Sequence, residues 1–202
     1  MKLIATPATL KIASNEKERK HLYELLAQRM TRHVEPSFIG EDMLRGYDDE
    51  ITARDLYHKH CAPVREVGFI TNNKWGFTLG YSPDGLIGED GQIEIKSRKQ
   101  KLHVQTIIED VAAGGIPAEH ALQVQTGLLV TERAWCDFIS YSNGLPMAIV
   151  RAVPIPEVQE RILAAAAEFE ARLKLREADY RAALMTARTI PTVRKAYAEF
   201  AA

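Results

Sequence analysis

Two acidic side chains and a lysine are spaced so that they could share one face of a small β-sheet. Asp84 comes first, and Glu94, Ile95 and Lys96 follow further along the chain. Residues i and i+2 of a β-strand share a face, so Glu94 and Lys96 would project together while Ile95 turns into the core. Mg²⁺ prefers carboxylate ligands, neutralises phosphate charge and makes bound water nucleophilic. The pattern indicates a site for phosphodiester hydrolysis, with the Ile95 carbonyl within reach of a metal and Lys96 orienting the attacking water.

The stretch that contains these residues is predicted to form strands. Short β-like segments alternate with Gly and Asp-Gly turns, as in an antiparallel meander. The segments lie at about residues 67–71, 75–81, 85–87 and 92–97. Polar and apolar residues alternate in the last segment, so we expect its polar face not to be buried core.

The turn at residues 88–91 decides which residue faces Asp84. A three-residue loop puts Asp84 opposite Glu94, whereas a two-residue loop puts it opposite Ile95. We expect the first register, because it brings the two carboxylates together.

A helix upstream carries a third acidic residue on a narrow face. Helical spacing over about residues 41–59 puts four side chains in one stripe, and they are Gly46, Glu50, Ala53 and Tyr57. A glutamate among such small neighbours is typical of a face that something large approaches. We therefore expect Glu50 to point toward the proposed site.

The remaining pattern predicts the fold class. Helices are expected at about residues 15–32, 103–112, 118–130 and beyond Pro156, and strands at 134–141 and 147–153. This order favours an α/β (mixed α+β) fold with a central mixed sheet flanked by helices. We expect one nuclease domain over residues 1–202, with a helical C-terminal extension from about residue 155.

Composition limits the partners of the chain. It has 202 residues, a formal net charge of −1 and a pI near 6.6, whereas a DNA-binding protein usually has a basic signature. Any DNA contact must therefore be local. Two basic stretches could supply it: one directly after the proposed catalytic strand, with Arg98 and Lys99, and one near the N-terminus, with Arg29. No apolar run approaches the roughly 20 residues that cross a bilayer. The cysteines, Cys61 and Cys136, lack metal-ligand spacing, so we expect a cytoplasmic protein with two free thiols and no membrane partner.

The acidic pattern has a simpler alternative interpretation. An acid, a gap and Glu-x-Lys often form a solvent-facing ladder of salt bridges on a sheet. Two amides, Gln123 and Gln125, favour the functional interpretation because they lie in an otherwise apolar helix, where each needs a partner.

Taken together, these motifs resemble the phage lambda-type exonuclease family of recombination nucleases, within the PD-(D/E)XK superfamily. The motifs run in the family's order over roughly residues 29–142. They are Ser82-Pro83-Asp84-Gly85-Leu86, Glu94-Ile95-Lys96, Gln123-Val124-Gln125, residues 130–135, and the Gly46 to Tyr57 stripe. The resemblance implies a PD-(D/E)XK, restriction-endonuclease-like core.

The resemblance also implies roles for the residues of the site. Asp84 and Glu94 would ligate the metal ions with help from the Ile95 carbonyl, and Lys96 would position or activate water. Glu50 would complete the shell of a second ion, and Gln123 would orient the nucleophile or the scissile phosphate.

Further residues are implied as DNA or phosphate contacts. Ser82 resembles the family's serine at the terminal phosphate, and Arg29 is the nearest candidate for an arginine that precedes the glutamate helix. Arg98 and Lys99 would contact the DNA. A Thr-x-Ser element that better-known members carry after that arginine is not clearly reproduced.

As a whole, the resemblance implies a Mg²⁺-dependent 5′-to-3′ exonuclease on linear double-stranded DNA, with two ions and Mn²⁺ as a substitute. The products would be 5′-mononucleotides and a 3′ single-stranded overhang for phage-type recombination. Members of the family form homotrimeric rings around DNA ends and act beside a single-strand annealing protein. Alternatives are another PD-(D/E)XK endonuclease and a non-catalytic DNA-binding module of the same fold.

Overall fold

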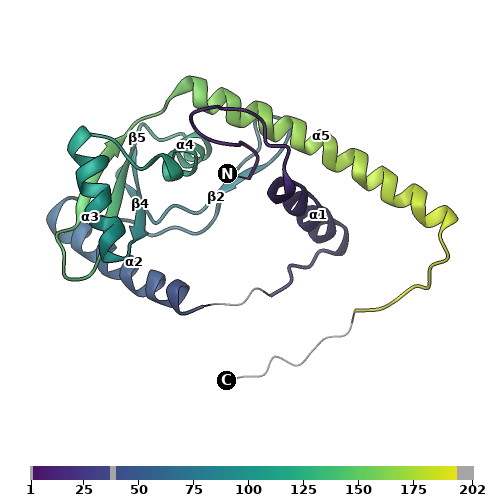
Figure 1. Cartoon of the computed structure of the whole chain (residues 1–202), viewed down its shortest axis with the longest axis horizontal. Coiled ribbons are helices and arrows are strands. Elements are labelled where there is room, and N and C mark those ends of the chain that lie inside the picture. Colours follow the sequence, from purple (N-terminus) through teal and green to yellow (C-terminus); the bar gives the residue numbers. More distant parts are fainter. Residues whose placement is uncertain (1, 37–39, 195–202) are drawn as a thin grey trace.

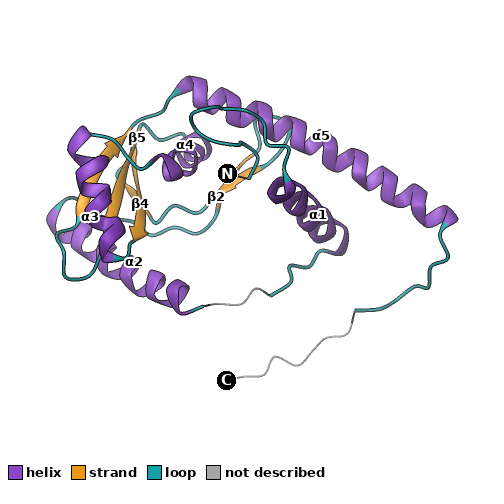
Figure 2. Ribbon diagram, in the orientation of Figure 1, coloured by secondary structure: helices purple, strands orange, loops and turns teal. Residues whose placement is uncertain are grey.

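A four-stranded mixed sheet forms the centre of the protein (Figures 1 and 2). The computed structural model describes residues 2–36 and 40–194. The strands follow the order β3 (Gly85–Ile87), β4 (Gly91–Ser97), β5 (Trp135–Tyr141) and β6 (Ala148–Ala152). The β4–β5 pair is parallel, and both outer pairs are antiparallel. A parallel pair needs a long crossover, and the helices between β4 and β5 supply it.

Helices cover both faces of this sheet, as the sequence predicts. Helix α2 (Glu41–His60) lies on one face, where Ala53 and Tyr57 pack against Ile93 and Ile95. Helix α4 (Ala118–Thr131) lies against the other face, where its apolar side chains Val124 and Leu128 join the core with Cys136 and Phe138 of β5. Alternation along the strands therefore sends Ile93 and Ile95 toward α2, and the polar residues of β4 toward α4.

The expectation that the polar face of β4 is not buried is wrong. Gln92 and Glu94 are 0% and 1% exposed, because α4 crosses above them. Glu94 accepts hydrogen bonds there, and the Thr131 hydroxyl donates to the Gln92 side-chain oxygen over 2.7 Å. Among the described residues, the Gln92 side-chain nitrogen has no hydrogen-bond partner. A polar face under a helix is tolerated when its groups are hydrogen-bonded.

The expectation of a single antiparallel meander is also wrong, because its strands belong to two separate sheets. Strands β1 (Ile70–Asn72) and β2 (Leu79–Tyr81) form a separate two-stranded sheet. Gly76 adopts a positive φ of 79°, which turns the chain within the expected segment 75–81 and shortens it to β2. Pro83 has no N–H to donate to a ladder, so the pairing stops between β2 and β3.

Two helices extend the protein beyond the sheet. Helix α1 (Glu16–Thr31) begins at Asn15, whose side chain accepts a hydrogen bond from the Glu18 N–H over 3.1 Å. Helix α5 (Pro156–Thr186) runs along α1 and continues past it (Figure 1). Their contact is a cluster of Leu22, Leu26, Phe169 and Leu173. Residues 195–202 of the expected extension lie outside the described residues.

The crossover between β4 and β5 contains two further helical segments. Helix α3 (Gln100–Glu109) begins and ends earlier than the expected 103–112, and a short 3₁₀ helix (Val111–Ala113) follows it. The buried His103 anchors α3, because its ring nitrogens lie 2.8 Å from the Ser140 hydroxyl and 2.9 Å from the Pro146 carbonyl. No helix in the described part of the chain is both long and apolar enough to span a membrane.

Candidate active site

The β3–β4 hairpin places the two predicted carboxylates side by side. Gly85 pairs with Ile93 and Ile87 with Gly91, so three residues form the loop and the register continues to Asp84 opposite Glu94. The expected register is confirmed. Gly88 supplies the positive φ of 51° that this turn requires.

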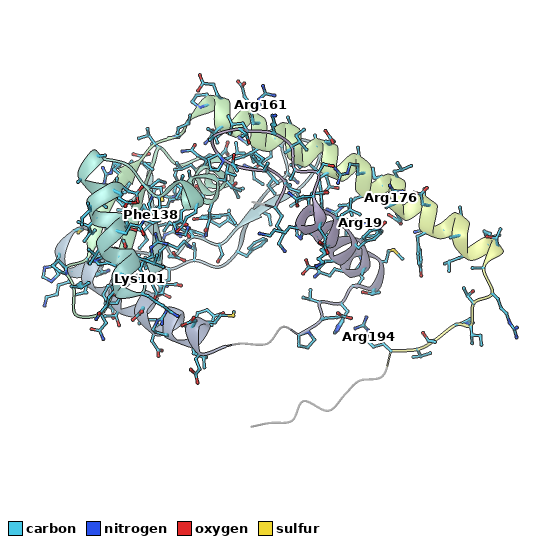
Figure 3. All side chains as sticks on the ribbon, viewed as in Figure 1. Arg19, Lys101, Phe138, Arg161, Arg176 and Arg194 are labelled. Carbon is cyan, nitrogen blue, oxygen red and sulfur yellow. The ribbon has the colours of Figure 1, made fainter. Side chains whose placement is uncertain are left out.

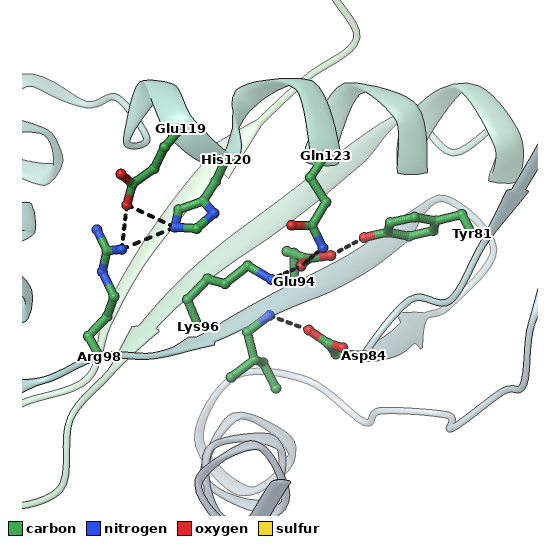
Figure 4. Close-up of polar contacts among 9 residues, drawn as sticks. Tyr81, Asp84, Glu94, Lys96, Arg98, Glu119, His120 and Gln123 are labelled. Atoms are coloured by element: carbon green, nitrogen blue, oxygen red, sulfur yellow. Dashed lines mark hydrogen bonds and ion pairs between the residues drawn. The ribbon is translucent and has the colours of Figure 1, made fainter. Parts of the chain in front are cut away.

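Glu94 receives three hydrogen-bond donors although it is almost fully buried (Figure 4). Lys96 Nζ and Gln123 Nε2 each lie 2.5 Å from Oε1, and the Tyr81 hydroxyl donates to Oε2. The donors come from β4, α4 and β2. Together they fix the orientation of the carboxylate and compensate for its removal from water.

Asp84 lies beside Glu94 without a cation of its own in the described part of the chain. Its Oδ2 accepts a hydrogen bond from the Ile95 N–H over 2.5 Å. Burial, followed by the negative charge of Glu94, raises the pKa of Asp84 from 3.8 to about 7. A buried and a half-buried carboxylate that repel each other form an arrangement that a bound cation stabilises.

Helix α2 adds Glu50 to this group through an arginine. Arg54 Nε donates to the Asp84 carbonyl oxygen over 2.7 Å, and the same guanidinium pairs with Glu50 and, at 3.0 Å, with Glu66. The charge of Glu50 contributes to the raised pKa of Asp84, and the shared Arg54 guanidinium links Glu50 to the backbone of Asp84. Arg54 was not predicted as a site residue, although it lies on the same helix face as Glu50.

The two amides of α4 have different positions. Gln123 reaches Glu94, whereas the Gln125 side chain is buried elsewhere. Gln125 donates to the Val153 carbonyl and accepts from the Ile155 N–H, both over 2.8 Å. It therefore ties α4 to the segment that precedes α5, and it lies outside the site.

The predicted DNA contacts do not converge on the carboxylates. Ser82 is exposed directly after β2, and Lys99 is paired with Asp42 at 3.2 Å. Arg98 is 11% exposed and donates to Glu119 over 2.6 Å and to Thr106 over 2.9 Å.

Arg29 lies on a different part of the molecule. It forms a two-pronged ion pair with Glu170 of α5, at 2.7 Å and 2.5 Å. Both residues line a cavity of about 1070 Å³ between α1, the loop before β2 and α5. The carboxylate site lies elsewhere, so this cavity does not hold the chemistry.

Cationic side chains are found on several helices outside the site. Figure 3 places the labelled cations Arg19 on α1, Lys101 on α3, and Arg161 and Arg176 on α5. Acidic side chains balance the cations over the whole chain, which has a net charge of −1. A strongly basic surface would have to be assembled locally or from several copies.

Sequence reasoning missed Tyr81 and His120, which complete the surroundings of the site. His120 stacks on Phe138 with ring centroids 5.4 Å apart, and its Nε2 lies 3.1 Å from Arg98. Burial, with the charges of Lys96 and Arg98, lowers its pKa to about 4, so the imidazole is neutral at pH 7. Tyr81 precedes the Ser-Pro-Asp motif directly, but its direction depends on the break between the two sheets.

The donor set fits a hard cation with oxygen ligands. Asp84 and Glu94 offer carboxylate oxygens, and the Ile95 carbonyl lies in the same strand as Glu94. In residues 2–36 and 40–194, no three His, Cys, Asp or Glu side chains are grouped closely enough to hold a metal ion. A cation here would therefore complete its shell with backbone oxygen, water and phosphate, as Mg²⁺ commonly does.

Comparisons with known proteins agree with this geometry. Residues 7–134 match the YqaJ-like viral recombinase domain. The crystal structure of the alkaline exonuclease LHK-Exo from Laribacter hongkongensis is 31% identical, has a TM-score of 0.69, and matches over 89% of this chain and 91% of that chain. LHK-Exo in complex with dAMP is 32% identical, with a TM-score of 0.70 over 86% and 89% of the two chains.

A more distant structure shares the fold alone. The phage-related exonuclease from Haemophilus somnus 129PT is 11% identical, with a TM-score of 0.58 over 87% of this chain and 92% of that one. No curated protein matches the sequence. The family match covers more than half of the chain, which therefore belongs to the YqaJ-like viral recombinase family, a family of nucleases of the phage lambda-exonuclease type within the PD-(D/E)XK superfamily.

Proposed function

We propose that the protein is a Mg²⁺-dependent exonuclease that digests linear double-stranded DNA from its 5′ ends. Each cycle would release a 5′-mononucleotide and lengthen a 3′ single-stranded overhang for phage-type recombination. The observation that carries the proposal is the pairing of Asp84 with Glu94, with Lys96 and Gln123 on the same Glu94 oxygen.

The proposed metal site consists of Asp84, Glu94 and the Ile95 carbonyl. Mg²⁺, or Mn²⁺ in its place, would supply charge neutralisation at the phosphate and a more acidic bound water. Glu50 would contribute to a second ion. Its ion pair with Arg54 would have to loosen for that role, because one carboxylate oxygen is already engaged.

Lys96 and Gln123 would act on the reacting groups. The Lys96 side chain is 23% exposed while Glu94 is 1% exposed, so its ammonium lies between the buried carboxylate and solvent. There it can hold the attacking water and offset negative charge in the transition state. The Gln123 amide would orient the nucleophile or the scissile phosphate from the opposite helix.

The proposed product and the proposed DNA contacts rest on separate observations. LHK-Exo was crystallised with dAMP, a deoxynucleoside 5′-monophosphate, which belongs to the product class we propose. Ser82, Arg98 and Lys99 remain our candidates for DNA contacts near the site, and Arg29 for a contact with the terminal phosphate. For Arg29 this role requires exchange of Glu170 for phosphate, since the two are paired.

The proposed assembly is a homotrimeric ring around the DNA end. Three copies of the Lys96 to Lys101 segment could line a basic channel although each chain has a net charge of −1. We further propose one nuclease domain with α5 as its helical extension, a cytoplasmic location and a single-strand annealing protein as partner.

A strand-resolved digestion tests this function. Linear duplex labelled on either strand, with or without a 5′-phosphate, is incubated with Mg²⁺ or EDTA, beside covalently closed circular duplex. We expect Mg²⁺-dependent shortening of each strand from its 5′ end, mononucleotide products and an intact circle, and Asp84→Asn should be inactive. Cleavage of the circle would favour an endonuclease, and DNA binding without hydrolysis would favour a binding module.

A further inference from the structure

The Tyr81 hydroxyl contacts the Glu94 oxygen that the other two donors leave unoccupied. Lys96 and Gln123 both donate to Oε1, whereas Tyr81 donates to Oε2. Tyr81 and Glu94 are 7% and 1% exposed, so water has little access to replace this hydrogen bond. With donors on both oxygens, the carboxylate cannot rotate without breaking at least one contact.

The backbone around Tyr81 fixes the position of its ring. Tyr81 ends β2 and pairs with Ile70 of β1. On the other side, a Cβ at Gly127 of α4 would lie only 2.6 Å from Cε1 and Cζ of the Tyr81 ring. Only glycine leaves space for the ring at this point of the helix, so the hydroxyl is held against Glu94 from two sides.

Tyr81 is the hydrogen-bond donor in this contact, because an ionised carboxylate can only accept. Burial, followed by the negative charge of Glu94, raises the pKa of the phenol well above its ordinary value of 10. Its hydrogen bond goes to Glu94, so its effect on the reaction passes through that carboxylate.

We propose that Tyr81 is a positioning residue that orients Glu94 for metal binding. The proposal rests on the proposed function, because it assigns Glu94 as a ligand. Hydrogen-bond partners behind a ligand raise its affinity by fixing its orientation, and their loss typically costs about 10- to 100-fold in metal affinity or activity. We expect a loss of this size when the hydroxyl alone is removed.

The test compares Tyr81→Phe with Tyr57→Phe in the full chain. Tyr57 is a matched control, because it is also buried and its hydroxyl donates to a buried carboxylate, Asp137 Oδ2, over 2.6 Å. Two quantities are measured for each variant: Mn²⁺ affinity by isothermal titration calorimetry, and the Mg²⁺ dependence of hydrolysis of linear duplex. Thermal unfolding in EDTA reports the stability of each variant.

We expect Tyr81→Phe to weaken Mn²⁺ binding about 10- to 100-fold and to raise the half-saturating Mg²⁺ concentration in parallel. Tyr57→Phe should lose stability but keep both metal constants. Wild-type Mn²⁺ affinity in Tyr81→Phe, or an equal loss in Tyr57→Phe, would overturn the proposal. If the wild-type protein shows no Mg²⁺-dependent hydrolysis, the proposed function fails, and the Mn²⁺ titration still decides the role of Tyr81.

Discussion

Arg54 donates a hydrogen bond from Nε to the backbone carbonyl oxygen of Asp84, and this contact joins α2 to the loop that carries the first carboxylate. The side chain is 13% exposed, and its other nitrogens pair with Glu50 and Glu66. One planar guanidinium therefore sets the distance between the helix with Glu50 and the β3–β4 hairpin.

Replacing Arg54 by lysine keeps the charge but removes this planar set of donors. We expect Arg54→Lys to lower the free energy of unfolding by about 1–3 kcal/mol and to slow hydrolysis roughly 10-fold or more. Urea denaturation and mononucleotide release are the measurements. Arg45→Lys, on the same helix but 43% exposed, is the control and should change stability by less than about 0.5 kcal/mol. Equal effects of the two substitutions would contradict the assignment.

Lys96 is expected to act in the reaction more than in folding. Lys96→Ala should reduce hydrolysis by at least about 100-fold, because it removes the ammonium beside Glu94. Mn²⁺ binding and binding of duplex DNA in Ca²⁺ should stay close to wild type, because Gln123 still donates to the same Glu94 oxygen and Tyr81 to the other. The exposed Lys59 provides the control substitution, Lys59→Ala, which should keep full activity. Full turnover by Lys96→Ala would remove the role assigned to this residue.

Alanine substitutions at Gln123 and Gln125 should have different effects, the first on activity and the second on stability. Gln123→Ala removes a donor to Glu94, so we expect hydrolysis to fall about 10- to 100-fold with little change in the thermal midpoint. Gln125→Ala leaves the Ile155 N–H and the Val153 carbonyl without this partner, so we expect a loss of about 1–3 kcal/mol with normal activity per folded molecule. The opposite pattern would exchange the roles of the two amides.

The raised pKa of Asp84 predicts a pH dependence of stability in the metal-free protein. Its pKa is about 7 in the folded chain and 3.8 as the ordinary value, so the folded state binds the proton more tightly. The contribution of Asp84 to the free energy of unfolding is therefore greatest below about pH 4. This contribution is lost as the pH rises through 7, and the loss is at most about 4 kcal/mol.

Asp84→Asn should remove that dependence. In EDTA at pH 8 we expect the variant to melt at a higher temperature than the wild type, and at pH 4 the two should converge. The amide oxygen introduced by the substitution would still accept the hydrogen bond from the Ile95 N–H. Thermal unfolding at several pH values measures the effect, and a variant that is less stable at pH 8 would show that repulsion between Asp84 and Glu94 is not the controlling contribution.

The local parts of the site were predictable from sequence because they depend on short-range geometry. A three-residue loop at Gly88 determines that Asp84 faces Glu94, and strand alternation puts Lys96 beside Glu94. Helical spacing likewise put Glu50 on the inner side of α2. Each of these relations lies within one hairpin or one helix, where residue spacing fixes the direction of the side chain.

The contacts between distant elements were not predictable in the same way. Glu94 is buried because α4 crosses β4, and nothing in the alternating pattern of β4 specifies which helix covers it. Tyr81 reaches Glu94 only because the meander breaks at Pro83 and β2 joins a different sheet. An arginine such as Arg29 is a suitable residue type for a phosphate contact. Its ion pair with Glu170, however, depends on the path of α5, which the sequence around Arg29 does not specify.

The position of α4 above β4 also bears on mutational tolerance. Its inner face has to fill the core with Val124 and Leu128, leave a gap at Gly127 for an aromatic ring, and present one amide to Glu94. A substitution on that face therefore disturbs folding and chemistry together, and the opposite face is constrained as well, because Leu122 packs against Ile162 and Ala165 of α5. Sequence drift should consequently be slow around the whole circumference of α4, apart from its exposed first residues, Ala118 and Glu119.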